Sequence, residues 1–434
     1  MKKLAKTLSC GLLAALMVLS IAGCGSKAST TGSTSAAASA SGEEVTLNAL
    51  FMKQAGYSED DVNAMTADFM AANPGIKVNV TFVAYEELEP KILTSAQSGG
   101  YDVVLGDCIW PAQFAKAGLV LDVTDRMADL DTSDIYEGAL DSTKYEGRYY
   151  GIPWLNDVKY MFCNTAMLAQ AGINTVPTTW DELVADAKIL KDQGIVEYPI
   201  AACYAQAECL ICDYTCISGA FGGSFVDADN NPTLNSPENV AALDFMYQTV
   251  ADGLTNPKSL EMIEDDVLST FTAGNAAFAL NWTYMNASMN DEAASSVAGQ
   301  AVIAPIPGTD KAVSATVNGG MPLMITAGSK HPDEAWAYMS FLASKDTQSK
   351  YCADALPIWK SLYSDPAVIA AGGEDVVNAS NTQYQYIVNR PQVAYYNELS
   401  TEMQTELQNV LLGKTTAQAA LDGLQAQAEE LAKG

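Results

Sequence analysis

Residues 45–82 read VTLNALFMKQAGYSEDDVNAMTADFMAANPGIKVNVTF, and this stretch decides the fold. Apolar and polar residues alternate over residues 45–50 and again over 76–82, which predicts two strands. Between them, residues 58–72 carry apolar side chains at helical spacing, and the Asn-Pro-Gly of residues 73–75 marks the turn into the second strand. The stretch therefore predicts a β-α-β unit.

The same alternation continues downstream. We expect a helix over residues 85–98, a strand over 101–105, and a helix over 111–117 that stops at Gly118. Strands that alternate with helices favour an open α/β sheet. About 390 residues follow residue 44, more than one hydrophobic core usually supports, so we expect two lobes.

The N-terminus has the pattern of an export signal. A basic start is followed by an apolar segment over residues 8–22, too short to cross a bilayer. Ile21-Ala22-Gly23-Cys24 then resembles the lipobox of bacterial lipoproteins. We expect a signal peptide over residues 1–23, a lipidated Cys24, and a flexible tether over 24–43. A plain signal peptide cleaved near Ala22 is the alternative.

The charge of the chain is strongly negative, at −29. Such a charge repels nucleic acid and disfavours adhesion to anionic lipid through the protein surface. Membrane association must therefore come from the anchor. We expect the protein outside the cytoplasm, lipid-anchored to the outer face of the cell membrane or in a periplasm.

The residues of common catalytic and metal sites are scarce. His331 is the only histidine of the chain, so a Ser-His-Asp hydrolase and a histidine-containing zinc site are not available. We expect no cofactor, no metal and no enzyme, although a glycosidase with two carboxylates stays open as an alternative. Asp227, Asp229 and Asn231 resemble the start of a calcium loop, but Pro232 stands where that loop needs glycine. A turn rich in Asp and Asn is the other interpretation.

Seven cysteines remain once Cys10 and Cys24 are set aside, an odd number that cannot pair completely. Three of them fall on one helix face, which favours packing in the core over a metal site. The state and role of five cysteines stay undecided from the sequence: Cys163, Cys203, Cys209, Cys212 and Cys216.

Four tryptophans lie at expected strand ends or loops beside polar residues, which is unusual for core tryptophan. Sugars present C–H faces that pack on aromatic rings and hydroxyl groups that need polar partners. Glu208, in a nearly uncharged run, fits the same chemistry, because ligand hydroxyls could satisfy its carboxylate. The four candidates are Trp110, Trp154, Trp282 and Trp359.

Taken together, the motifs after the tether resemble the family 1 extracellular solute-binding proteins, relatives of maltose-binding protein. In order, these motifs are residues 73–78, 101–104, 114–118, 151–153, 177–183, 271–276 and 330–342.

This resemblance implies two α/β lobes, each a mostly parallel sheet flanked by helices, with three crossovers between them. The ligand would lie in the cleft, which closes by hinge bending. The expected first lobe is residues 44–153 with 321–375, and the second is 158–316 with 390–434. The expected hinge segments are 154–158, 316–320 and 375–390.

The resemblance also implies the residues that would contact the ligand. The first lobe would supply its rim, the crossovers would bring backbone groups close, and a guanidinium near the C-terminus could donate two hydrogen bonds to adjacent hydroxyls. Position by position, these residues are Asp107, Trp110, Trp154, Asn156, Asp157, Glu208, Trp282, Tyr284, Asn318, Gly319, Gly320, Trp359, Arg390 and Tyr395.

The expected function is reversible capture of a neutral sugar, oligosaccharide or polyol by a monomer that delivers it to the permease of an ABC importer. Three alternatives stay open: a secreted carbohydrate-active enzyme, a solute sensor that docks on a receptor kinase, and capture of a metal or anion. The sequence does not decide which sugar is bound, or whether the source has a periplasm or a thick wall.

Overall fold

The computed structural model describes residues 44–53, 55–353 and 355–433. The expected signal peptide, Cys24 and the tether lie outside these residues.

The opening stretch folds as predicted. β1 (Val45–Met52) and β2 (Ile76–Val83) pair in parallel, and α1 (Glu59–Ala72) connects them. Ser58 caps α1, because its hydroxyl accepts the backbone N–H of Asp61 and the Asp61 carboxylate accepts the backbone N–H of Ser58. The β-α-β unit is therefore fixed by its own local sequence.

The first sheet has five strands in the order β2-β1-β3-β12-β6. β3 (Val103–Leu105) extends the parallel part, whereas β12 (Met321–Ile325) runs antiparallel to both β3 and β6 (Ile152–Leu155). The strand between β3 and β6 thus comes from a much later part of the chain. The helices and short elements of this part are α2 (Tyr85–Ser95), α3 (Pro111–Lys116), α4 (Thr124–Met127), η1 (Thr132–Asp134), α5 (Glu137–Asp141), β4 (Lys144–Tyr145), β5 (Arg148–Tyr149), α12 (Pro332–Leu342) and α13 (Lys345–Lys350).

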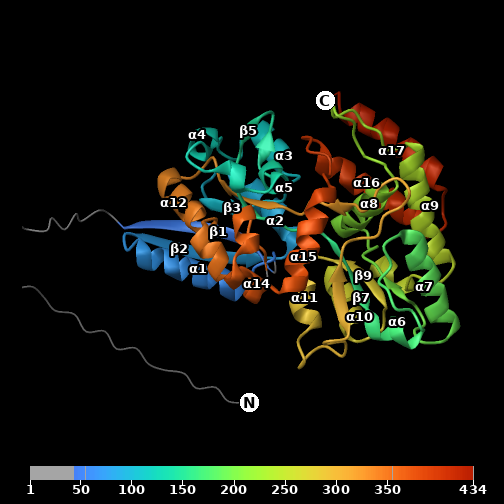
Figure 1. Cartoon of the computed structure of the whole chain (residues 1–434). Coiled ribbons are helices and arrows are strands. Elements are labelled where there is room, and N and C mark those ends of the chain that lie inside the picture. The colour runs from blue at the N-terminus through green and yellow to red at the C-terminus, as the bar shows by residue number, and fades with distance from the viewer. Residues whose placement is uncertain (1–43, 54, 354, 434) are drawn as a thin grey trace, which may run out of the picture. The chain divides into compact units, whose positions relative to one another are not determined.

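The second sheet has four strands in the order β10-β7-β9-β8. They are β7 (Tyr160–Asn164), β8 (Ile200–Ala201), β9 (Phe278–Asn281) and β10 (Ala301–Ala304). Figure 1 shows the two sheets in separate groups of elements. The helices around this sheet are α6 (Thr165–Gln170), α7 (Trp180–Asp192), α8 (Glu208–Ala220), α9 (Pro237–Ala251), η2 (Pro257–Glu261), α10 (Glu264–Thr272), α11 (Tyr284–Met289), α16 (Tyr396–Leu411) and α17 (Ala417–Leu431).

The two-lobed α/β architecture is confirmed, and one strand of each sheet, β12 in the first and β7 in the second, runs opposite to the other strands. β7 is antiparallel to β9 and β10, and only β8 and β9 pair in parallel in the second sheet. The reason lies in the crossovers between the lobes. β7 begins where the chain leaves the first lobe and β9 ends where the chain returns to the cleft, so the two strands run in opposite directions. The same holds for β12, which starts at a crossover.

Residues 356–377 contact the cores of both lobes. Ile358 and Trp359 pack in the core of the first lobe, whereas Leu356 and Tyr363 pack with the second. α15 (Glu374–Gln383) also packs against the second lobe, since its apolar side chains, Val376 and Val377 among them, belong to that core. The expected boundary of the first lobe at residue 375 stays a prediction. The other elements here are η3 (Lys360–Ser364), α14 (Pro366–Gly372), η4 (Tyr384–Tyr386) and a two-stranded pair of β11 (Thr316–Val317) and β13 (Ile387–Val388).

Within the described ranges we find no helix of the length and apolar character that a bilayer span requires.

Candidate functional site: a cleft between the two lobes

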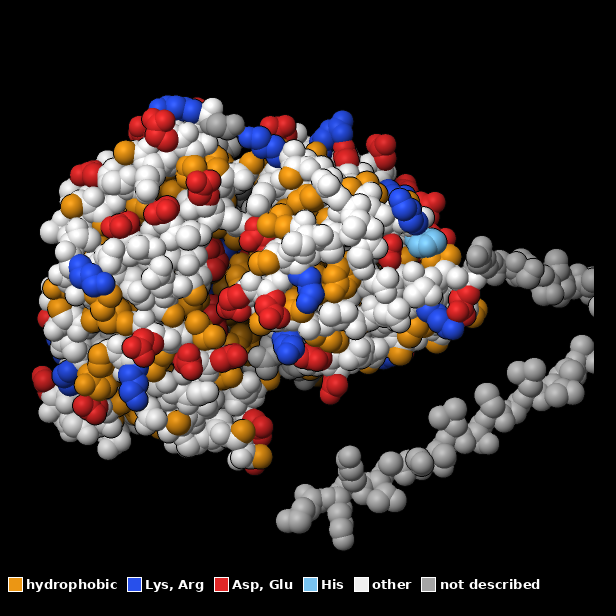
Figure 2. Space-filling view, turned by 180° about the vertical axis from the view of Figure 1, so that it is seen from behind, with side chains coloured by type: hydrophobic (Ala, Val, Ile, Leu, Met, Phe, Trp, Pro, Cys, Tyr) orange, Lys and Arg blue, Asp and Glu red, His pale blue; other side chains and the backbone are white. Residues whose placement is uncertain are grey.

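A cleft of about 500 Å³ lies between the two sheets, a volume typical of sites for small molecules. Figure 2 shows a hollow in the surface with acidic and hydrophobic side chains along its edges. Strand ends and crossovers from both lobes meet there, as in other open α/β sheets. The lining residues are Met52, Lys53, Ala55, Gly56, Glu59, Ala84, Tyr85, Glu86, Asp107, Leu155, Asp157, Ala207, Glu208, Cys209, Cys212, Ile263, Glu264, Asp265, Trp282, Tyr284, Gly319, Met321 and Arg390.

Half of the expected contact residues line this cleft. The structure brings together residues from six separate parts of the sequence, which no local pattern connects. These residues are Asp107, Asp157, Glu208, Trp282, Tyr284, Gly319 and Arg390.

Arg390 links the two walls of the cleft. Its side chain is only 2% exposed, and its two terminal nitrogens donate to Asp107 Oδ1 and Glu208 Oε1, each at 2.8 Å. Asp107 belongs to the first lobe and Glu208 to the second. The guanidinium is therefore occupied by the protein's own carboxylates, whereas we had expected it to donate to ligand hydroxyls.

Glu208 is the first residue of α8, where a negative charge is stabilised by the helix dipole. Besides Arg390, its carboxylate accepts hydrogen bonds from the hydroxyl groups of Tyr396 and Ser400 on α16. Three groups from two segments thus share one carboxylate. This network satisfies Glu208 without a ligand.

Tyr85 contributes an aromatic face to the first wall. Its hydroxyl donates to Asp107 Oδ2 at 2.8 Å, and its ring stacks on Trp110 with the centroids 5.7 Å apart. Trp110 itself is buried behind Tyr85 and does not line the cleft. Trp110 therefore lies behind the ring that lines the cleft. Tyr85 could have been found from its place directly after a strand end.

Trp282 is the half-buried aromatic residue of the second wall. Its indole nitrogen donates to Glu264 Oε1 at 3.2 Å, and the ammonium of the buried Lys159 lies 5.3 Å from its ring centroid. Gly319 packs against the ring so closely that a Cβ there would lie 2.3 Å from Trp282 Cζ3. The ring is thus fixed from several sides.

Asp157 lies where the chain first crosses to the second lobe. Its carboxylate accepts the backbone N–H of Val158 at 2.9 Å and the hydroxyl of Thr283. Burial raises the pKa of Asp157 to about 6, although these hydrogen bonds oppose the increase. The charge of Asp157 therefore changes in mildly acidic solution.

Two of the expected tryptophans pack in the first core. Trp154 contacts Phe51 and Tyr57, at centroid distances of 5.4 and 5.0 Å. Trp359 is also buried, and its indole nitrogen donates to the carbonyl oxygen of Ala343 at 2.8 Å. Neither ring lines the cleft.

Asn156, Asn318, Gly320 and Tyr395 lie near the crossovers without lining the cleft. Asn318 is buried; its side chain donates to the carbonyl oxygen of Gly138 at 3.0 Å and accepts the backbone N–H of Gly320 at 2.9 Å. The carbonyl oxygen of Asn156 accepts the Tyr384 hydroxyl, and Tyr395 packs against the cores of both lobes. These contacts shape the crossover segments.

Four acidic residues of the cleft were not expected from the sequence: Glu59, Glu86, Glu264 and Asp265. They lie in the first turns of α1, α2 and α10, where acidic side chains are common because the helix dipole stabilises a negative charge there. A sequence pattern therefore does not distinguish them from ordinary helix starts.

The seven described cysteines are buried and free of disulfide bonds. Cys209 and Cys212 reach the cleft beside Glu208, while Cys163 and Cys216 pack in the second core and Cys203 lies next to it.

The Asp227 carboxylate accepts hydrogen bonds from backbone N–H groups of its own turn. Asp227 Oδ1 accepts the backbone N–H groups of Asp229 and Asn231, each at 2.9 Å. In residues 44–433, leaving aside 54 and 354, no group of three or more His, Cys, Asp or Glu is placed to hold a metal ion.

Comparisons with known proteins agree with this architecture. The model of the bacterial extracellular solute-binding protein family matches residues 54–349. A relative from Deinococcus radiodurans, named a probable ABC transporter-binding protein, is 27% identical over 76% of this chain and 80% of its own length.

Two solved structures are similar in fold and sequence. Maltose-bound MalE3 of T. maritima has a TM-score of 0.81 and 26% identity, covering 89% of this chain and all of its own. A solute-binding protein of an ABC transporter from Agrobacterium radiobacter K84, in complex with ribitol, has a TM-score of 0.79 and 28% identity, covering 90% and 99%. With a two-lobed fold, a cleft between the lobes and a family match over most of its length, this chain belongs to the bacterial extracellular solute-binding proteins, a family of binding proteins and not of enzymes.

Proposed function

We propose that the protein captures a neutral sugar, oligosaccharide or polyol in the cleft and delivers it to the membrane permease of an ABC importer. The relatives with bound maltose and ribitol support this ligand class, and the Deinococcus relative supports the link to an ABC transporter.

The single observation that carries the proposal is the surroundings of Trp282. A half-buried indole faces a cleft whose other groups include the Tyr284 ring and the carboxylates of Asp157, Glu264 and Asp265. Aromatic faces pack against the C–H faces of a sugar, and carboxylates accept hydrogen bonds from its hydroxyl groups. The cleft offers both kinds of partner within one volume.

Closure of the lobes around the solute would supply the signal to the permease. The expected passages between the lobes are residues 154–158, 316–320 and 375–390, and a few residues at such passages can absorb a hinge motion. A solute that contacts both walls stabilises the closed form over the open one. The permease can then distinguish loaded from empty protein.

A melting-temperature screen against a panel of sugars and polyols tests the proposal. The panel contains maltose, maltotriose, ribitol, D-mannitol and D-glucose, with sodium citrate as an anionic control. A solute that binds only the native state raises the melting temperature. We expect at least one neutral compound to do so, with a dissociation constant of about 1 μM, which corresponds to a binding free energy of about −8 kcal/mol.

A panel with no effect, or a response to citrate alone, would remove the sugar assignment. The same mixtures, analysed by chromatography after incubation, test the enzyme alternative; we expect every sugar to be recovered intact.

We also propose that the protein is exported and held outside the cell by lipid on Cys24, as a monomer. The motif before Cys24 supports lipidation, and the Gly, Ser, Ala and Thr of the following residues suit a tether. Cys24→Ser should release the protein into the medium or periplasm, with unchanged solute affinity. Retention of Cys24→Ser in the membrane fraction would show that another part of the chain holds it there.

A further inference from the structure

Lys159 is placed unusually for a lysine. Among the described lysines it alone has a fully buried side chain, and it lies just before β7, behind the second wall of the cleft. Transfer of an ammonium group into a protein interior costs several kcal/mol unless it is paired. The surroundings of Lys159 must therefore compensate this cost.

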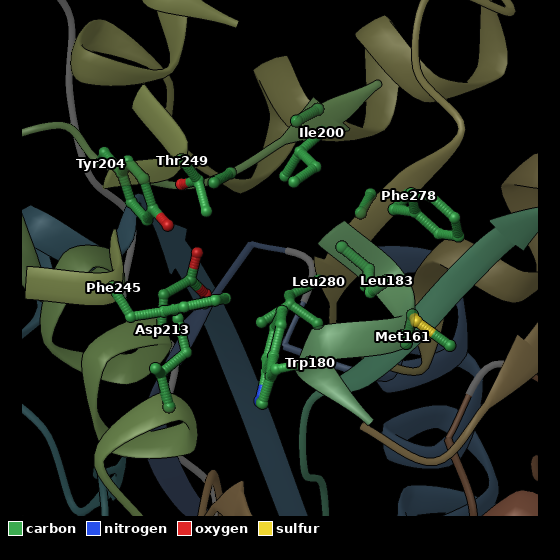
Figure 3. A pocket seen from close by; sticks show the side chains of 14 residues that line it. Met161, Trp180, Leu183, Ile200, Tyr204, Asp213, Phe245, Thr249, Phe278 and Leu280 are labelled. Carbon is green, nitrogen blue, oxygen red and sulfur yellow. The ribbon is translucent and has the colours of Figure 1, made fainter. Parts of the chain in front are cut away.

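Asp213 provides the ion pair. Its Oδ1 lies 2.6 Å from Lys159 Nζ, and its Oδ2 accepts the backbone N–H of Cys203 at 3.0 Å. Figure 3 shows the Asp213 carboxylate at a cavity of about 20 Å³, lined by apolar side chains and by Tyr204 and Thr249. Burial alone would lower the pKa of Lys159, but the adjacent Asp213 carboxylate more than offsets this and raises it well above its ordinary value. The ammonium is thus charged at neutral pH.

The other side of Lys159 faces two residues of the cleft. Its Nζ lies 3.8 Å from Glu264 Oε1 and 5.3 Å from the centroid of the Trp282 ring. The same Glu264 oxygen accepts the indole N–H of Trp282 at 3.2 Å. The ammonium, the carboxylate and the indole therefore form a closed set of three, in which each contacts the other two.

This set has one buried end and one end in the cleft. Lys159 is fully buried, the Glu264 side chain is 25% exposed, and Trp282 is half-buried. The backbone of Lys159 is held as well, because its carbonyl oxygen accepts the Thr316 hydroxyl at 2.7 Å. An ammonium near an aromatic face stabilises that placement of the ring, more so when it is shielded from water.

We propose that Lys159 is a positioning residue of the cleft, whose buried ammonium holds the Trp282 ring and the Glu264 carboxylate in place from inside the second lobe. This inference rests on the proposed function, since it describes how the second wall is set before a sugar arrives. A wall that is already ordered loses less conformational entropy on binding.

The test removes both buried charges together, so that neither is left unpaired. Lys159→Met with Asp213→Asn keeps an oxygen that can accept the Cys203 N–H. Each protein is also made with Trp282→Phe, and the difference between the two emission spectra isolates Trp282. Lys191→Met is the matched control, because the ammonium of Lys191 on α7 lies 5.5 Å from the centroid of the Tyr198 ring, and neither residue lines the cleft.

In the folded double variant, the Trp282 difference emission should shift and its quenching by acrylamide should rise. The affinity for maltose or ribitol, whichever the unmodified protein binds, should fall about tenfold in calorimetry. Lys191→Met should change neither. A double variant that melts at a lower temperature, yet keeps the Trp282 emission and the affinity, would overturn the proposal, because Lys159 would then only stabilise the core.

Glu264→Gln decides the question if the double variant does not fold. It leaves the pair of Lys159 and Asp213 intact and removes the charge through which the ammonium reaches the indole nitrogen. Unchanged Trp282 emission in this variant would overturn the proposal. The emission measurement needs no sugar, so a protein that binds neither maltose nor ribitol would contradict the proposed function without deciding the role of Lys159.

Discussion

Arg390 and Asp107 form a buried ion pair, with 2.8 Å between Nη2 and Oδ1, although 283 residues separate them in the sequence. The same guanidinium also reaches Glu208 on the opposite wall of the cleft. One side chain therefore joins the two lobes in this conformation.

Arg390→Met should destabilise the protein by about 3–5 kcal/mol, because it leaves two buried carboxylates without their cation. Urea unfolding measures this loss. Arg126→Met is the control, since Arg126 pairs with the exposed Asp333 at the surface. This variant should lose less than about 1 kcal/mol of unfolding free energy. Equal losses for the two variants would show that the bridge contributes no more than a surface pair.

Trp282→Ala should weaken sugar binding by about 1–3 kcal/mol, the usual loss for a central aromatic residue, without unfolding the lobe. Calorimetry gives the affinity, and far-ultraviolet circular dichroism checks the fold. Trp336→Ala is the matched control, because Trp336 is half-buried on α12 outside the cleft. The role of Trp282 is refuted if both variants bind equally well.

Gly319→Ala should impair binding through Trp282. The added Cβ would overlap the ring, so the indole must move. We expect a loss similar to that of Trp282→Ala, and no further loss when the two changes are combined, because both act on one contact. Gly75→Ala, where a Cβ meets nothing within 4 Å, should leave the affinity unchanged. Additive losses of affinity would show that Gly319→Ala acts through a contact other than the one with Trp282.

Asp157 should make stability depend on pH. Its pKa is about 6 in the folded protein and near 3.8 when unfolded, so the folded state binds the proton more tightly. The stabilisation from this proton is present below about pH 4 and is lost as the pH rises through 6.

Asp157→Asn removes this titration and keeps an acceptor for the Val158 N–H. The stability of the unmodified protein relative to this variant should therefore decrease by about 2–3 kcal/mol between pH 4 and pH 7. Unfolding curves across that range measure the difference, and a constant difference would contradict the raised pKa.

The sequence predicted the β-α-β start and the two lobes because local patterns determine them. Ser58 with Asp61 caps α1, and Thr179 with Glu182 caps α7, both within a few residues of chain. Strand directions could not be read in this way. They depend on which end of each strand meets the cleft, and that is settled by contacts between distant segments.

The cleft residues follow a rule that the tryptophans alone did not reveal. Side chains on an extended chain alternate between two sides. Residues 155, 157, 319 and 321 line the cleft, whereas 154, 156, 318 and 320 do not. Trp154 therefore has the opposite phase from Leu155 and Asp157, which line the cleft. The sequence contains the alternation, but not which of its two sides faces the ligand.

The position of β12 between β3 and β6 has a consequence for the order in which the protein can be built. On the ribosome, all four strands of the second sheet have been made once residue 304 is added, whereas the first sheet lacks the strand between β3 and β6 until residue 325. Until residue 325 has been made, the N-terminal half of the chain cannot form the complete first sheet. The first lobe can therefore complete its sheet only after about three quarters of the chain has been made.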